Sequence, residues 1–417
     1  MFGVGTQRRE EGPHGRLARE TDRSTVAPGR AMSDTTIDAP PAPRKPERST
    51  ARRSLFNPWV DFLTLGGGSL VVLAAVAAFM PRDEETRAVL AATMLFVAHF
   101  VNHPHFAHSY QLFYRGFLHK AFSPASTLRH RYLTAGIVVP VAIVSFFGIA
   151  LARADAAMLG LAANVMFFTV GWHYAKQGFG VLMVDAAHKA VRFTTAERRH
   201  LLWNVHLAWV NVWLLANNEL AMKKYWGLSY IVFDVPDPLL AAATAAVVVS
   251  TFVVCRDLVA RWLRERALPV NGLIGYACGV YIWLMVSRFD PLLLLVVPVF
   301  HSLQYMVVVW RYQLNAERRP GGRSRRGGTS LAALMGTYPA RLARFALLAG
   351  VLGVVGFWWG PQLLDAVVDY DRASFGTTAF LFMAWTFINI HHYFIDNVIW
   401  RRDNADMREH LFRPLRE

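Results

Sequence analysis

The segment TRAVLAATMLFVAHFVNHPHFAH, residues 86–108, sets the character of the chain. Its first half is apolar enough to enter a bilayer, and its second half contains His99, His103, His105 and His108. Ionisable side chains at membrane depth are costly and rare, so they are by default candidates for a functional site. We therefore expect a membrane-spanning helix that brings imidazoles into a protein interior.

The composition of the whole chain supports a membrane protein. Of its 417 residues, 54% are hydrophobic and 18% are charged, whereas about a quarter of the residues of a soluble domain are charged. We predict an all-α fold, a polytopic transmembrane helix bundle of about ten spans, each near the ~20 residues that cross a bilayer. The predicted spans are residues 62–81, 86–108, 133–153, 156–183, 200–217, 239–258, 269–287, 291–312, 342–361 and 376–400.

Lysine and arginine are concentrated in alternate loops, including the run ERRPGGRSRRGG at 317–328. Because cytoplasmic loops are enriched in these residues, both termini are expected in the cytoplasm, at a bacterial inner membrane. The net charge of +15 then reflects topology and not nucleic-acid binding, since the basic patches lack interleaved aromatic residues.

This pattern divides the chain into three predicted parts. Residues 1–55 are polar and rich in proline, which predicts a disordered basic tail. Residues 56–400 form the transmembrane domain, with a cytoplasmic basic loop at 313–341, and residues 401–417 form a cytoplasmic tail. Met32 is an alternative start to Met1.

A layer of histidines is predicted to bind metal. It consists of His99, His103, His173, His301, His391 and His392. In the predicted topology they lie roughly 12–17 Å from the cytoplasmic helix ends, at 1.5 Å per residue, so they can meet. His99 and His103 are four residues apart and share a helix face. His391 and His392 point about 100° apart, so one would bind the metal and the other a second metal or a hydrogen-bond partner.

Pro104 removes a backbone donor and is predicted to kink or end the helix just before His105. His105 and His108 are therefore candidates for extra ligands or for caps at the interface, and we favour caps. Polar residues about one turn from the histidines are predicted to orient the imidazoles. These are Asn102, Gln177, Gln304 and Asn389. Asp396 is predicted to be catalytic, by polarising His392 or relaying protons.

Imidazoles without thiolates suit iron, copper or zinc, and not magnesium or calcium. The HExxH motif of zinc peptidases is absent, although a zinc centre with three histidines remains an alternative. A haem would need only one or two axial histidines, and it also remains an alternative.

The motifs HFVNHPHFAH (99–108) and NIHHYFID (389–396) resemble the histidine boxes of integral-membrane non-haem iron enzymes of the fatty-acid desaturase and hydroxylase type. Histidines spread one or two per helix are also similar to the bacteriorhodopsin-related membrane carotene dioxygenases. The usual HxxHH box is missing, because Ile388 stands three residues before His391.

The resemblance implies an oxidoreductase that activates oxygen at one or two non-haem iron ions. It further implies hydroxylation, desaturation or oxidative cleavage of a lipid or isoprenoid dissolved in the bilayer. The chain contains neither a GxGxxG fingerprint nor a CxxC cluster. Electrons are therefore expected from a separate cytoplasmic reductase.

An alternative function is a transporter with an intramembrane relay of His and Asp residues for protons or a cation. Glycines around His173 and Pro298 near His301 allow interrupted helices of the kind that transporters use. Stoichiometric iron in the purified protein discriminates the enzyme from the transporter. The sequence leaves open the exact substrate, the reaction outcome, the number of metal ions and the oligomeric state.

Overall fold

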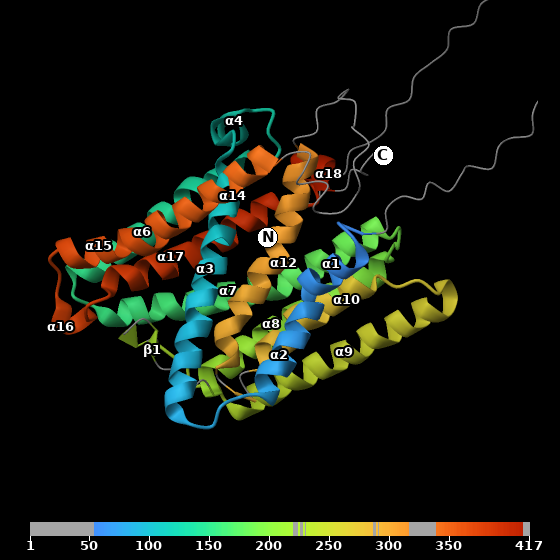
Figure 1. Ribbon diagram of the computed structural model, residues 1–417, viewed down its shortest axis with the longest axis horizontal. Coiled ribbons are helices and arrows are strands. Elements are labelled where there is room, and N and C mark those ends of the chain that lie inside the picture. The colour runs from blue at the N-terminus through green and yellow to red at the C-terminus, as the bar shows by residue number, and fades with distance from the viewer. Residues whose placement is uncertain are drawn as a thin grey trace, which may run out of the picture. The chain divides into compact units, whose positions relative to one another are not determined.

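The computed structural model describes residues 54–219, 224–225, 228–229, 231–286, 289–290, 292–316 and 339–411. In this part of the chain nearly all regular structure is helical (Figure 1). One pair of two-residue antiparallel strands, β1 (Lys224–Tyr225) and β2 (Leu228–Ser229), accompanies the helices. The helical fold class predicted from the sequence is confirmed.

The helices fall into two sequence halves. The first half contains α1 (Pro58–Phe62), η1 (Leu63–Gly67), α2 (Gly68–Ala78), α3 (Glu84–Tyr114), α4 (Phe117–Phe122), α5 (Arg129–Leu133), η2 (Thr134–Val138), α6 (Val139–Ala152), α7 (Ala156–His188) and α8 (Thr195–Glu219). The second half contains α9 (Asp237–Glu265), α10 (Val270–Ala277), η3 (Cys278–Ile282), α11 (Trp283–Met285), α12 (Leu293–Ala316), α14 (Pro339–Val354), η5 (Val355–Trp359), α15 (Gly360–Val367), α16 (Arg372–Phe375), α17 (Ala379–Ile399) and α18 (Ala405–Leu411). The η segments are π-helical turns within longer helices.

Five helical stretches of the described chain are long and apolar enough to cross a membrane, fewer than the ten predicted. They are Pro58–Ala78, Arg129–Ala152, Ala156–His188, Asp237–Glu265 and Ala343–Val367. The helices α3 and α17 are also long, but they contain the histidines and amides predicted for the site, which lower their mean hydropathy. The residues that suggest a function therefore also make these helices less apolar than a lipid-facing span.

Helix α3 runs without a break from Glu84 to Tyr114 with Pro104 inside it, so the prediction that Pro104 ends the helix is wrong. Proline costs a backbone hydrogen bond, but α3 packs against α12, α14 and α17, and this tertiary packing holds the helix through the proline. Because the helix continues, Asn102 and His105 share one face, while His99 and His103 share another.

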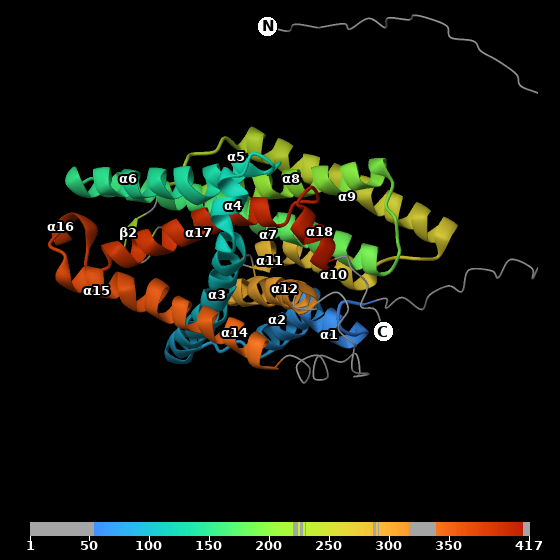
Figure 2. The same ribbon diagram turned by 90° about the horizontal axis from the view of Figure 1, so that it is seen from above.

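The helices α3, α7, α12 and α17 form the centre of the described fold. Figures 1 and 2 show α3 beside α12, and α17 packs against both α3 and α7. Glycines let neighbouring helices approach closely: a Cβ atom at Gly275 of α10 would lie 2.5 Å from the Leu65 carbonyl oxygen of η1, and one at Gly279 of η3 would lie 3.1 Å from the Tyr174 carbonyl oxygen of α7. Substitution at either glycine would push the helices apart.

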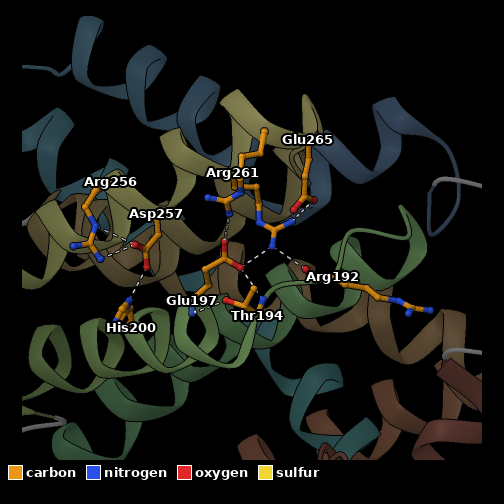
Figure 3. Close-up of polar contacts among 9 residues, drawn as sticks. Arg192, Thr194, Glu197, His200, Arg256, Asp257, Arg261 and Glu265 are labelled. Atoms are coloured by element: carbon orange, nitrogen blue, oxygen red, sulfur yellow. Dashed lines mark hydrogen bonds and ion pairs between the residues drawn. The ribbon is translucent and has the colours of Figure 1, made fainter.

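A group of paired polar and charged side chains lies where α8 and α9 pack together (Figure 3). The fully buried Arg261 forms ion pairs with Glu197 at 2.6 Å and Glu265 at 2.5 Å. Glu197 also accepts a hydrogen bond from the Thr194 N–H, and its own N–H donates to the Thr194 hydroxyl, so the two residues form a capping box for α8. Nδ1 of His200 in α8 lies 2.6 Å from a carboxylate oxygen of Asp257 in α9, so His200 also connects the two helices.

The pKa of Glu197, which precedes the predicted span 200–217, is lowered. Burial alone would raise the pKa of this carboxyl group, but hydrogen bonds from Arg261 and Thr194 outweigh burial. Each formal charge in this group thus meets an opposite charge or a donor suited to it.

The two ends of the described chain pack into the fold. Leu55 and Phe56 are buried, and their N–H groups donate to the Asp61 carboxylate. After α17, α18 packs against α12, where the Tyr312 hydroxyl donates to Asp406. The predicted tail therefore includes a docked helix. Most of the predicted N-terminal tail, and the loop residues 317–338, lie outside the described residues.

Candidate metal centre

Four histidines from four different helices meet in the interior: His105 of α3, His173 of α7, His301 of α12 and His392 of α17. One ring nitrogen from each lies within 4.8 Å of the others. His105, His301 and His392 are buried, and His173 is partly buried. The structure thus brings together three of the predicted ligands, with His105 as the fourth. We call these four residues the histidine cluster.

The imidazoles of the histidine cluster are close enough to share one ion. The Nε2 atoms of His173 and His392 are 3.0 Å apart, and the ring centroids of His173 and His301 are 4.7 Å apart. Those of His105 and His392 are 4.5 Å apart. Two nitrogens on one metal at about 2.1 Å lie at most about 4.2 Å apart, so small side-chain rotations close the group around an ion.

Hydrogen bonding supports a cation at this position. Within the described part of the chain, neither ring nitrogen of His301 has a hydrogen-bond partner, and the same holds for Nε2 of His105 and Nδ1 of His392. A buried polar atom left unpaired costs about 1–3 kcal/mol. A metal ion would engage these lone pairs directly, so the residues present fit a bound metal.

The ring of His105 is oriented by its neighbours. Its Nδ1 lies 3.1 Å from the Asn102 side-chain oxygen, which also accepts a hydrogen bond from the Ser302 hydroxyl at 2.8 Å. Nδ1–H can therefore donate to Asn102, which leaves the Nε2 lone pair for a metal. Asn102 thus orients His105, one turn along α3, and not His99 as the sequence suggested.

One carboxylate accompanies the histidine cluster. The Asp396 Oδ2 atom lies 3.5 Å from Nε2 of His392 and 3.8 Å from Nε2 of His173, and it makes no hydrogen bond within the described chain. The other oxygen, Oδ1, accepts a hydrogen bond from the Tyr305 hydroxyl at 3.1 Å. Asp396 therefore offers either a further ligand atom or a proton acceptor beside the imidazoles.

The side-chain amides of Gln177 and Gln304 form hydrogen bonds near His301, but neither bonds to its imidazole ring. Gln177 donates to the His301 carbonyl oxygen and to the Gln304 side-chain oxygen, both at 2.9 Å. Gln304 in turn donates to the Leu65 carbonyl oxygen at 2.6 Å. The His301 ring itself stacks on Tyr174, with centroids 4.0 Å apart. These contacts fix α12 against α7 and η1.

The other predicted ligands lie outside the histidine cluster. His99 and His103 pack among aromatic rings, with Trp385 4.6 Å and 5.3 Å from them between centroids. His391 uses both ring nitrogens, one with the Tyr110 hydroxyl at 2.7 Å and one with the Ala135 carbonyl oxygen at 2.9 Å. The sequence left open which residue of the pair His391–His392 would bind metal, and the geometry favours His392.

Two further candidate residues, His108 and Asn389, contact groups outside the histidine cluster. His108 contacts Gln111 at 3.1 Å and stacks on Phe345. Both His105 and His108 are buried within α3, so the prediction that they cap the helix at the interface is wrong. Asn389 donates to the Trp385 carbonyl oxygen of its own helix. The signal that could have identified His105 is its i, i+3 spacing from Asn102.

No family model matches this chain, and neither a curated protein nor a solved structure is significantly similar to it. The fold and the site therefore define its class by themselves. It is a helical protein whose described residues include five helices fit to span a membrane and four buried or half-buried histidines that can hold a metal ion.

Proposed function

We propose that the protein is a membrane-embedded, histidine-ligated non-haem iron oxygenase that acts on a lipid or isoprenoid. The observation that carries this proposal is the convergence of four imidazoles with one carboxylate and without a thiolate. Imidazole and carboxylate ligands suit iron. Four nitrogen ligands would close a tetrahedral zinc site but leave positions open on iron, which can take six ligands. When bound, iron would supply the activation of dioxygen.

The protein residues have separate roles in this proposal. Asn102 holds the His105 ring with its Nε2 lone pair toward the histidine cluster. Asp396 provides a base, and the Tyr305 hydroxyl that donates to it also contacts Ser109. This short chain of hydrogen bonds can hold or pass a proton at Asp396. Phe106, Trp385 and Ile388 form an apolar group nearby that excludes water.

The surroundings of the site favour a hydrophobic substrate. The helices that enclose it pack among five stretches fit to span a membrane. A molecule already dissolved in a bilayer would reach such a site without crossing water. We further propose about ten spans in the folded protein, with both termini in the cytoplasm of a bacterium and a separate cytoplasmic reductase as the electron donor.

Metal analysis of purified protein tests this function. The wild-type protein should contain close to one iron per chain, and His301→Ala should contain almost none, because His301 has no other partner to hold its ring nitrogens. His108→Ala is the matched control, since it removes a buried histidine outside the histidine cluster. Equal iron in the wild type and in His301→Ala would overturn the proposal, and stoichiometric zinc would replace the oxygenase with a zinc centre.

The transporter alternative has one supporting observation, the hydrogen-bonded run Asp396–Tyr305–Ser109, which a proton relay would also use. A relay has no need of a bound transition metal. Wild-type protein that takes up no iron, but moves protons across the membrane of a sealed vesicle, would support it.

A further inference from the structure

A groove of about 340 Å³ opens on the surface between α5–η2 and α17. One wall carries His130, Arg131 and Thr134, and the other carries Phe394, Asn397 and Val398. The segments α5 and η2 pack against α17, and Figure 2 shows α5 near this helix. The groove therefore lies on the helix that contains His392, and its lining residues on that helix follow His392 within two turns.

The groove is cationic at its rim and apolar at its floor. Arg131 is exposed, and the Asp403 carboxylate lies near enough to interact with its charge, but Asp403 forms its ion pair with Arg401. His130 is exposed beside it and offers a ring N–H donor. Phe394 is half-buried and Val398 is buried. A cationic rim above an apolar floor suits a molecule with an anionic head and a hydrocarbon body.

The groove also lies at the level where lipid headgroups would be. Arg131 is close to the first residue of the candidate span Arg129–Ala152, and basic side chains at span ends contact headgroups. Further along the same helix Val138, Val141 and Val144 are each 59% exposed. They form an aliphatic surface that a lipid chain can follow from the groove into the bilayer.

The backbone connects this groove to the segment that carries the candidate ligand. The π-helical turn η2 (Thr134–Val138) forms part of the wall, and such turns occur frequently at functional sites. Within it, the Ala135 carbonyl oxygen accepts a hydrogen bond from the His391 ring at 2.9 Å. His391 is adjacent to His392 in the sequence, so a molecule in the groove would contact the residues that position a cluster histidine.

We propose that this groove binds the anionic headgroup, a phosphate or a carboxylate, of a membrane lipid whose hydrocarbon chain lies along α6. This lipid site rests on the groove itself and not on the proposed function.

Lipid binding to the purified full-length protein in neutral detergent tests the proposal. The probes are oleate and phosphatidic acid as anionic lipids, phosphatidylcholine as a zwitterionic lipid, and inorganic phosphate as a free anion. Arg131→Gln should weaken binding of both anionic lipids about fivefold, since one basic side chain near a headgroup contributes about 1 kcal/mol. Arg131→Lys should restore most of the affinity.

The matched control is Arg153→Gln, which removes an exposed arginine at the opposite end of α6. It should leave lipid affinity unchanged. Equal affinities of wild type and Arg131→Gln would overturn the proposal, as would phosphatidylcholine binding as tightly as the anionic lipids. Binding of inorganic phosphate and phosphatidic acid without oleate would indicate a phosphate site and not a lipid site.

Metal content measured on the same samples separates this proposal from the previous one. Arg131→Gln should retain iron, and His301→Ala should lose iron while still binding oleate. If wild-type protein binds oleate through Arg131 but contains no iron, the oxygenase proposal fails and the headgroup site stands.

Discussion

The histidine cluster and the polar group between α8 and α9 are both buried and both built from ionisable side chains, but they are completed in different ways. Between α8 and α9 the guanidinium of Arg261 meets the carboxylates of Glu197 and Glu265. In the histidine cluster four imidazoles face one another, and several of their nitrogens lack a hydrogen bond in the described chain. In the first group opposite charges meet, although Nε of Arg261 lacks a hydrogen bond in the described chain, whereas in the second the atoms without a hydrogen bond include imidazole nitrogens that a metal ion would engage.

The largest expected effect is that of metal on stability. At a free metal concentration 1,000-fold above the dissociation constant, binding to the folded state alone adds about 4 kcal/mol to the free energy of unfolding. Thermal unfolding in detergent, with metal and with a chelator, measures this difference. His301→Ala should abolish it, while a change in the α8–α9 group should not. A wild-type protein equally stable under both conditions would mean that the two groups do not differ as described.

Glu197→Gln should lower the free energy of unfolding by about 3 kcal/mol, because Arg261 stays buried and loses its more buried carboxylate partner. Denaturant titration of the metal-free protein measures this. Glu265→Gln is the matched control: it removes the same charge from the same arginine, but the Glu265 side chain is 46% exposed, so the loss should be smaller. Both variants should keep the metal content of wild type.

Asn102→Ala should weaken metal binding about 10- to 100-fold, or about 1.4–2.8 kcal/mol, because the His105 ring loses the acceptor that orients it. Competition with a chromophoric chelator gives the affinity. Ser302→Ala, which removes only the hydroxyl that supports Asn102, should have less effect. An unchanged affinity in Asn102→Ala would show that the metal does not use His105.

The smallest expected effect is the pH dependence of the α8–α9 group. The pKa of Glu197 lies below its ordinary value of 4.5 in the folded protein, so the ionised form stabilises the fold. This contribution is fully present above pH 4.5 and is lost as the pH falls through the lowered pKa. Stability measured from pH 7 down to pH 3 should show this loss in wild type, and Glu197→Gln should show less of it.

The sequence was informative about the site where a helix carries one histidine in an apolar setting. His173 and His301 were each predicted as ligands, and both lie in the histidine cluster. Asp396 was predicted beside His392, and its Oδ2 lies 3.5 Å from that ring. A polar residue in an otherwise apolar helix is expected to face the protein interior and not lipid. For a helix with a single histidine, the sequence is therefore enough to indicate which side chain faces the other helices.

The sequence was less informative where several histidines share one helix. Which face of α3 turns inward depends on its packing against α12 and α17, and this face holds His105 in place of His99 and His103. Pro104 made a helix end at this point the natural expectation, because a proline is costly in isolation. Fewer helices of the described chain are long and apolar enough to span a membrane than the ten predicted, since helices inside a bundle need not be uniformly apolar.

The order of the four cluster residues along the chain has a consequence for biosynthesis. His105, His173, His301 and His392 belong to four helices that emerge from the ribosome one after another. The pocket is incomplete until α17 has been made and packed against α3 and α7. An ion held by all four histidines would therefore be loaded after translation, into helices that are already packed together.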